Sequence, residues 1–231
     1  MDEAILKALN VVVGHPGQID TALILIASNP LFKGVPVMML VWALWTRPAP
    51  HRAQLRARLA AALVAGVLAI ALGRALSMLL PYRPRPIHDP DLALRVADTL
   101  GAHTLNGWSS MPSDHAVLFF ALAAGIAMAH RLAGLVAGLH ALVVVSLPRI
   151  ALGFHWPSDI LVGAFAGGLL AVALVPMLAR LAGALDLERR LETQGWVLYP
   201  ILFLVTHQLG TMFAEARWLA TVVAAMAGVT I

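Results

Sequence analysis

The sequence predicts an all-α integral membrane protein: a helical bundle of about six transmembrane helices, preceded by a short amphipathic helix. Of the 231 residues, 60% are hydrophobic and only 12% are charged, which is far from the composition of a soluble domain. The apolar residues gather in long stretches, and a helix needs roughly 20 of them to cross a bilayer. Gly, Ala, Leu and Val dominate these stretches, as is typical of closely packed membrane helices.

We expect a single membrane domain over residues 1–231, with the chemical motifs confined to 59–181 and extra helices over 194–231. The first apolar stretch is interrupted at Asn29-Pro30 and Pro36, which predicts a kink or a re-entrant start because proline breaks a regular helix. The last stretch, 218–231, is short, and both a span and an interfacial helix stay open for it. The predicted spans are 21–45, 59–80, 116–129, 132–147, 160–181 and 196–213, and the amphipathic helix is 4–13.

The distribution of arginine predicts the orientation in the membrane. Arginines gather in the loop 47–58, at the turn 130–131 and in the loop that follows residue 180, and alternating spans place these three segments on one side. The positive-inside rule makes that side cytoplasmic. The opposite side then holds residues 81–112 and 146–159, where all the candidate chemical residues lie. We therefore expect a multi-pass protein of the inner membrane with its site facing the periplasm or the exterior.

Composition also excludes several classes of function. The excess of 16 Lys and Arg over 12 Asp and Glu is mild and forms no dense basic stretch, so we expect no nucleic-acid partner. The absence of cysteine excludes a disulfide framework, a zinc–thiolate site and a thiol nucleophile. The N-terminus, Met1-Asp2-Glu3, is acidic where a signal peptide would be basic, so we expect insertion through the internal helices. No metal or cofactor is predicted, and the oligomeric state stays open.

Three polar residues precede the fifth predicted span. His155 and Asp159 are four residues apart, which places both side chains on one face of a helix that begins near Pro157. An aspartate bonded to one ring nitrogen fixes the tautomer and leaves the other nitrogen free to attack. Arg149 lies near enough in sequence to reach the same pocket. The alternative is an interfacial His–Asp pair that only caps the helix.

A second group opens the third predicted span, with the sequence Pro112-Ser113-Asp114-His115. Proline, serine and aspartate suit a helix start, where free backbone N–H groups and the positive end of the dipole favour a bound phosphate. His115 in that first turn could donate a proton to a leaving oxygen. The alternative is an ordinary cap followed by an interfacial histidine.

A third group follows the second predicted span. Arg83 and Arg85 alternate with prolines in a stiff, extended segment just outside the bilayer, and Arg74 precedes them on the helix. Guanidinium groups bind phosphate oxygens in a bidentate way, which explains arginine rather than lysine. Interfacial arginines often only anchor a helix. Positive charge on the outer side, however, opposes the topology rule and favours a functional role.

Together, these three groups resemble the signature of the type-2 phosphatidic acid phosphatase superfamily of membrane phosphatases. That signature is a lysine, six residues and Arg-Pro; then Pro-Ser-Gly-His; then Ser-Arg, five residues, His, three residues and Asp. Here Arg85-Pro86 closes the first element, Pro112 to His115 form the second, and Arg149, His155 and Asp159 match the third at full spacing. The resemblance covers roughly residues 59–181.

The resemblance implies a helical membrane bundle and a metal-independent phosphatase that acts through a phosphohistidine. It implies that His155 is the nucleophile, that Asp159 orients it and that His115 is the general acid, which later activates the hydrolytic water. Arg85, Arg149 and Ser113 would hold the phosphate. The first residues of the chain also resemble the start of bacterial undecaprenyl-pyrophosphate phosphatases of this superfamily, although over a short and degenerate stretch.

The chain departs from the signature at three positions. Met78 occupies the lysine position, and Arg74, one turn earlier on the same face, is the candidate substitute, with Arg83 as the alternative. Asp114 replaces glycine and adds a negative charge beside the phosphate site. Pro148 replaces the serine before the arginine, which removes one hydroxyl contact.

The sequence therefore predicts a membrane phosphatase that acts on a lipid phosphate or pyrophosphate, with an isoprenoid pyrophosphate such as undecaprenyl pyrophosphate as the first choice. Phosphatidic acid and phosphatidylglycerol phosphate are the next candidates. A lipid phosphotransferase, a vanadate-dependent haloperoxidase and a non-catalytic lipid-binding or transport protein are the alternatives. His88, His103 and Trp108 could line the entrance to the site, with a plain surface role at least equally open.

Overall fold

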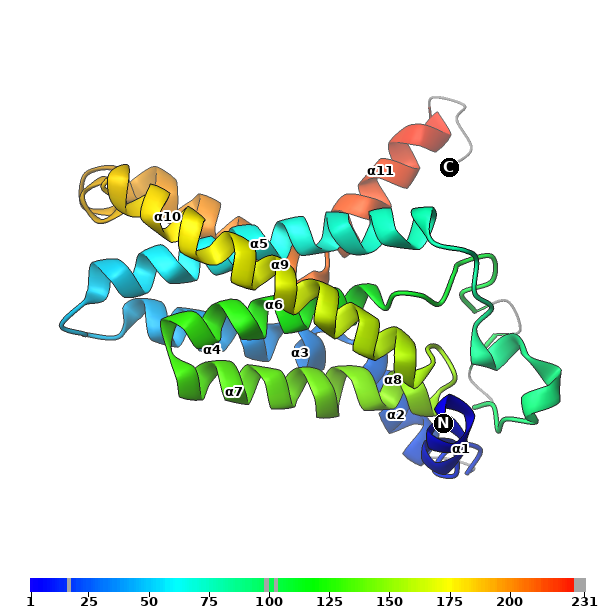
Figure 1. The fold of residues 1–231 in the computed structure, drawn as a ribbon. Coiled ribbons are helices and arrows are strands. Elements are labelled where there is room, and N and C mark those ends of the chain that lie inside the picture. The colour runs from blue at the N-terminus through cyan, green and yellow to red at the C-terminus, as the bar shows by residue number, and fades with distance from the viewer. Residues whose placement is uncertain (16–17, 98–99, 102–103, 227–231) are drawn as a thin grey trace.

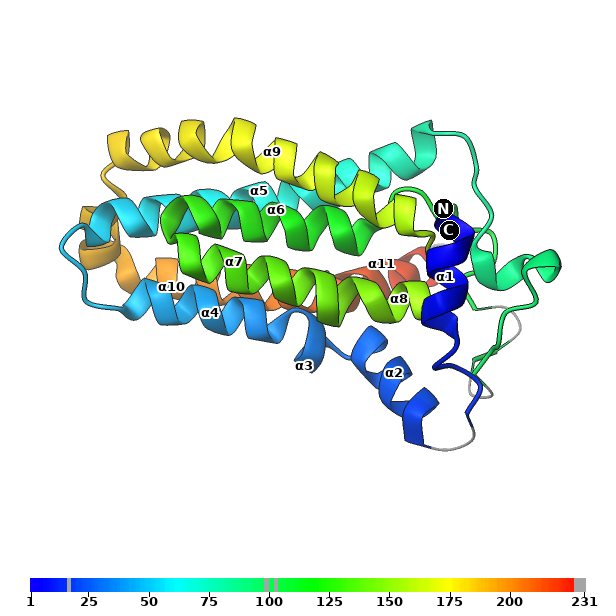
Figure 2. The same ribbon diagram turned by 60° about the horizontal axis from the view of Figure 1, so that its bottom comes forward.

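The computed structural model describes residues 1–15, 18–97, 100–101 and 104–226, and this part of the chain is helical with no β-strand. The long helices run beside one another as an elongated bundle (Figure 1). The loops that follow α5 and α8 lie at one end of the bundle, and the turns before α5, α7 and α10 lie at the other end. The first helix, α1 (Asp2–Asn10), lies across the loop-rich end (Figure 2).

The first predicted span is divided into three helices: α2 (Gln18–Ser28), α3 (Pro30–Lys33) and α4 (Val35–Thr46). The side chain of Asn29 caps α3 by accepting the backbone N–H of Leu31 at 2.9 Å, and Pro30 takes the first helical position. Pro36 lies in the first turn of α4. The predicted interruption of this stretch is therefore confirmed, and it has the form of helix starts.

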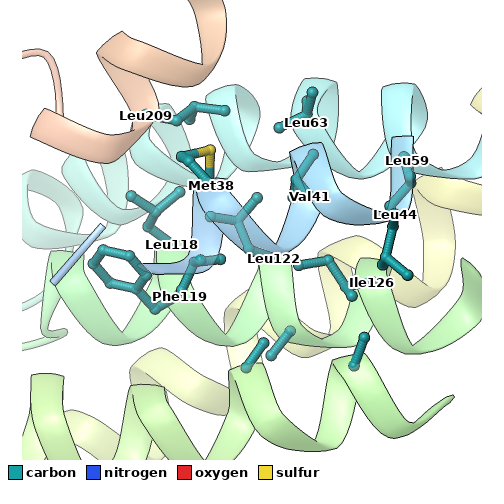
Figure 3. Packing of buried hydrophobic residues seen from close by; sticks show 14 of the residues in the cluster. Met38, Val41, Leu44, Leu59, Leu63, Leu118, Phe119, Leu122, Ile126 and Leu209 are labelled. Carbon is teal, nitrogen blue, oxygen red and sulfur yellow. The ribbon is translucent and has the colours of Figure 1, made fainter. Parts of the chain in front are cut away.

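The centre of the bundle is α6 (Asp114–Ala129), which packs against α5 (Arg52–Leu79), α9 (Pro157–Ala184) and α7 (Arg131–His140). A π-helical segment (Ala141–Ser146) continues α7 into α8 (Leu147–Ala151). Figure 3 shows Leu118, Phe119 and Leu122 of α6 beside Met38 and Val41 of α4. These side chains are buried, so the first turn of α6 is held in a fixed place.

Close contact between α6 and α9 depends on glycine. A Cβ atom at Gly167 would lie 2.0 Å from the carbonyl oxygen of Val117, and one at Gly163 would lie 2.8 Å from the Cβ of Ala116. The two backbones can approach this closely only because neither glycine carries a side chain, as is common where membrane helices cross. The start of α9 is thereby held against the start of α6.

The six expected membrane spans are not all confirmed by the length and composition of the helices. Within the described residues, three helical segments are long and apolar enough to cross a bilayer: Arg52–Leu79, Arg131–Ala151 and Pro157–Ala184. A fourth counts only if Gly195–Thr211 and Ala214–Val223, which meet at 86°, form one bent span. They belong to α10 (Leu187–Thr211) and α11 (Ala214–Met226). Six spans are not confirmed, because α4 and α6 have only 12 and 16 residues.

Candidate active site

His155 lies in the turn between α8 and α9 and is only 6% exposed. Its Nδ1 atom is 2.8 Å from the carbonyl oxygen of Ser110, and its Nε2 atom is 3.3 Å from Nη1 of Arg85. A carbonyl only accepts hydrogen bonds and a guanidinium only donates them. We therefore assign the proton of the neutral ring to Nδ1 and the free lone pair to Nε2, on the side of Arg85.

Burial lowers the pKa of His155 below its ordinary value, and the positive charge of Arg85 adds to this effect, whereas Asp159 opposes it. The neutral ring, which is the nucleophilic form, therefore persists to lower pH than in a free histidine. Burial also lowers the pKa of Arg85, although the carboxylates of Asp114 and Asp159 act in the other direction.

Asp159 is completely buried in the first turn of α9, which begins at Pro157 as expected. Its Oδ2 atom accepts the backbone N–H of Trp156 at 2.8 Å, and its Oδ1 atom accepts Nη1 of Arg83 at 2.6 Å. Oδ2 lies 3.7 Å from Nδ1 of His155, which is beyond hydrogen-bond distance. The nearest acceptor for the ring is therefore the carbonyl of Ser110, and the orienting role of Asp159 stays a prediction.

Arg85 follows α5 in the loop that closes this end of the bundle, and its guanidinium is held by three carbonyl oxygens. The acceptors are Phe154 at 2.7 Å from Nη1, Ser109 at 3.2 Å from Nη2 and Trp108 at 3.2 Å from Nε. These bonds connect two loops that are far apart in sequence and fix the cation beside Nε2 of His155.

Ser113 joins the second group of the signature to the third. Its Oγ atom accepts the backbone N–H of Ala116 at 3.4 Å, which confirms the predicted helix start. Its own N–H donates to the carbonyl oxygen of Asp159 at 3.2 Å. His115 follows in the first turn of α6, half-buried, with its ring stacked on Phe119 at 6.5 Å between centroids. It interacts electrostatically with His155, so the two histidines share one region of the fold.

Arg149 is 5% exposed, and two of its nitrogens donate to backbone oxygens: Nη1 to Val145 at 2.9 Å and Nη2 to Ala27 at 2.6 Å. It interacts electrostatically with Arg85 and His115. Two buried cations thus lie in the same region as the histidines, and a phosphate group would neutralise their charges.

The two candidate substitutes for the motif lysine lie in different surroundings. Arg74 stacks over the ring of Trp108, with its Cζ atom 3.7 Å from the ring centroid, and it interacts electrostatically with Asp114. Arg83 donates instead to Asp159, to Oγ of Ser158 at 2.8 Å and to Oδ2 of Asp2 at 3.0 Å. The guanidinium of Arg83 is therefore occupied by carboxylates, whereas Arg74 contacts the segment that also binds Arg85.

The carboxylate of Asp114 has one oxygen without a hydrogen-bond partner among the described residues. This atom, Oδ1, is buried and lies against Gly73 of α5. A Cβ at that glycine would be 3.2 Å from Oδ1. Met78, at the lysine position of the signature, is 71% exposed and takes no part in the site.

Some residues that complete the site were not predicted. The carbonyl groups of Ser109 and Ser110 bind Arg85 and His155, but a backbone acceptor leaves no pattern in a sequence. Asp2, which contacts Arg83 and Ser158, stands in the sequence only as one of two acidic residues at the N-terminus. His103 lies outside the described residues, and His88 binds the carbonyl oxygen of Thr104 at 2.9 Å, in the loop that carries the η1 (Pro86–His88) and η2 (Pro90–Leu92) turns.

Comparison with known proteins gives two findings. A family model described as the PAP2 superfamily matches residues 57–182, which is more than half of the chain. A protein of Escherichia coli (strain K12), provisionally named undecaprenyl-diphosphatase YbjG, is 28% identical over 148 residues, which cover 63% of this chain and 67% of that protein. No solved structure matches the chain significantly.

Proposed function

This chain belongs to the PAP2 superfamily of phosphatases, and on that premise we propose that it hydrolyses a lipid phosphate or pyrophosphate through a phosphohistidine. The observation that carries the proposal is the position of His155. Its ring is oriented by the carbonyl of Ser110, and Nε2 is directed toward the Arg85 guanidinium, where a phosphate would bind. A nucleophile beside a fixed cation suits attack on phosphorus.

In the proposed first step, Nε2 of His155 forms a bond to phosphorus while the bond from phosphorus to the leaving oxygen breaks. His115 gives that oxygen a proton, and Arg85 and Arg149 compensate the negative charge on the remaining phosphate oxygens. In the second step, water attacks the phosphohistidine and gives a proton to His115. The N–P bond breaks, phosphate is released and the neutral His155 ring is restored.

A lipid substrate is supported by the position of the site at one end of a bundle of apolar helices. A headgroup could reach His155 there while its tail stays in the bilayer. The name of the E. coli relative supports undecaprenyl pyrophosphate as the first choice. Phosphatidic acid and phosphatidylglycerol phosphate are the alternatives, and by the positive-inside rule the site faces the periplasm or the exterior.

The test is phosphate release by the purified protein in detergent with a chelator present. Undecaprenyl pyrophosphate and phosphatidic acid are compared at matched lipid and detergent concentrations, with His155→Ala as the blank. We expect release that is absent in the variant and faster for the pyrophosphate. Release from neither lipid, or release that survives in His155→Ala, would overturn the proposal. Transfer of phosphate to an added lipid alcohol would identify a phosphotransferase.

A further inference from the structure

The first helix, α1, has two polar residues and one apolar residue in a row on one face. Asp2, Leu6 and Asn10 follow one another at intervals of four residues, so their side chains lie in a row along α1. Leu6 is completely buried, and Asn10, 4% exposed, binds the backbone of Arg95 and the carbonyl oxygen of Ala151. These contacts hold α1 across the end of the bundle (Figure 2).

Asp2, at the start of this row, reaches the first turn of α9. Its Oδ1 atom accepts a hydrogen bond from the backbone N–H of Ser158 at 3.0 Å. Its Oδ2 atom accepts one from Nη2 of Arg83 at 3.0 Å and another from the Ser158 hydroxyl. Burial raises the pKa of Asp2, but the hydrogen bonds from Ser158 and Arg83 outweigh this and leave the pKa below its ordinary value. The side chain is therefore a carboxylate at neutral pH.

The contacts continue from Asp2 to the nucleophile. Arg83 lies between two carboxylates, with Nη2 on Asp2 and Nη1 on Asp159 at 2.6 Å. Its guanidinium also lies over the ring of Trp156, with Cζ 5.1 Å from the centroid. Asp159 in turn lies 3.7 Å from Nδ1 of His155. Two residues, Arg83 and Asp159, thus connect the N-terminal helix to the proposed nucleophile.

We propose that Asp2 is a positioning residue of the active site and that α1 is a strap whose carboxylate holds Arg83 against Asp159. The proposal rests on the proposed function, because it concerns the same histidine. Asp2 touches no reacting atom. It fixes the guanidinium that neutralises Asp159 and caps the helix whose first turn carries Asp159.

The charges of Asp2, Arg83 and Asp159 predict the direction in which the pKa of His155 changes when Asp2 is neutralised. If Asp2 becomes a neutral amide, the positive charge of Arg83 is balanced by Asp159 alone, and the potential at His155 becomes more positive. A more positive potential disfavours the protonated ring, so the pKa of His155 should fall further. The other charged or titratable groups that interact with His155 are Arg85, Asp159, Asp114 and His115.

The kinetic test compares Asp2→Asn with Glu3→Gln, a matched control in the same turn that removes one negative charge. Glu3 is exposed, and its ion-pair partner within the described part of the chain is Lys7. We expect about a 10-fold fall in kcat for Asp2→Asn, the scale found for outer-shell hydrogen-bond partners of metal ligands, with KM unchanged and the acid limb of the pH profile moved to lower pH. Asp2→Glu should restore part of the activity. Equal kcat and pH profiles for Asp2→Asn and wild type would overturn the proposal.

A second measurement does not depend on turnover. In protein labelled with ¹³C at histidine, the His155 resonance is assigned by its loss in His155→Ala and then titrated by NMR. Asp2→Asn should lower this pKa, and Glu3→Gln should not. An unchanged pKa, even with reduced kcat or thermal stability, would mean a purely structural cap and would overturn the proposal. If the wild type releases no phosphate, the proposed function fails, but this titration still decides the role of Asp2.

Discussion

Nε2 of His155 lies 3.3 Å from Nη1 of Arg85, and the same guanidinium donates to the carbonyl oxygens of Phe154 and Ser109. A lysine ammonium cannot reproduce this set, because it is a point donor without the planar fork. We expect Arg85→Lys to reduce kcat/KM by about 10²-fold, the scale of one lost donor to a developing charge. Phosphate release measures the loss, and an unchanged thermal midpoint shows that folding is intact. Activity near wild type would contradict this role.

The lowered pKa of His155 predicts the pH dependence of the reaction. In the proposed mechanism the His155 ring attacks in its neutral form, so kcat/KM should fall as the pH drops through this pKa, whereas loss of the proton from His115, the proposed general acid, would give a separate alkaline limb. The acid limb should therefore lie below about 6.5, the ordinary histidine value. The profile is measured with two lipids whose phosphate groups ionise at different pH. If the pH of the acid limb changes with the ionisation of the lipid phosphate, or lies above 6.5, the limb cannot be assigned to His155.

The contact between α9 and α6 predicts different outcomes at two adjacent glycines. A Cβ at Gly167 would clash with the carbonyl oxygen of Val117, whereas a Cβ at Gly168 would meet nothing within 4 Å. We expect Gly167→Ala to destabilise the protein by about 1–3 kcal/mol and to reduce activity, since the start of α9 carries Asp159. Gly168→Ala should be neutral or slightly stabilising. Thermal unfolding in detergent distinguishes them, and equal midpoints would mean that the helices are less closely packed.

The unusual pair of Arg74 and Asp114 predicts non-additive mutations. Asp114 has a buried oxygen without a hydrogen-bond partner in the described structure, and Arg74 is the cation that contributes most to stabilising its charge. We expect Arg74→Ala to raise KM and Asp114→Gly to reverse part of that loss, with a coupling energy of about 0.5–3 kcal/mol. A double-mutant cycle on kcat/KM measures it. If Arg74→Ala leaves activity intact, Arg74 is only a helix residue.

Local signals in the sequence predicted the fold where they specify backbone geometry. Asn29-Pro30 marked the interruption of the first apolar stretch, Ser113 marked the cap of α6, and Pro157 marked the start of α9. The number of spans was harder to predict, because an apolar stretch has the same composition whether it crosses a bilayer or fills the centre of a bundle. After Asp114 and His115, the 16-residue α6 is apolar, and it packs against α5, α7 and α9.

The site was predicted as a set of residue types, but not as a set of contacts. The spacing of His155 and Asp159 brought both to one turn, yet the ring is bound by the carbonyl of Ser110. The sequence also placed Arg83 and Arg85 together, whereas the structure directs one to carboxylates and the other to His155. Alternate residues of an extended segment point to the same side, so the spacing alone gives Arg83 and Arg85 the same surroundings, and only the packed neighbours direct them to different partners.

The last turns of α5 extend past the level of Asp114, in the first turn of α6. Gly73 lies beside Asp114, and α5 continues to Leu79, six residues or about 9 Å further along its axis. Met78 and Leu79 are 71% and 81% exposed, so the last turn of α5 presents an apolar surface. A substrate that moves within the bilayer plane would arrive already at the right depth. Turnover should then obey surface-dilution kinetics, in which the mole fraction of lipid in the micelle sets the rate and its bulk molarity does not.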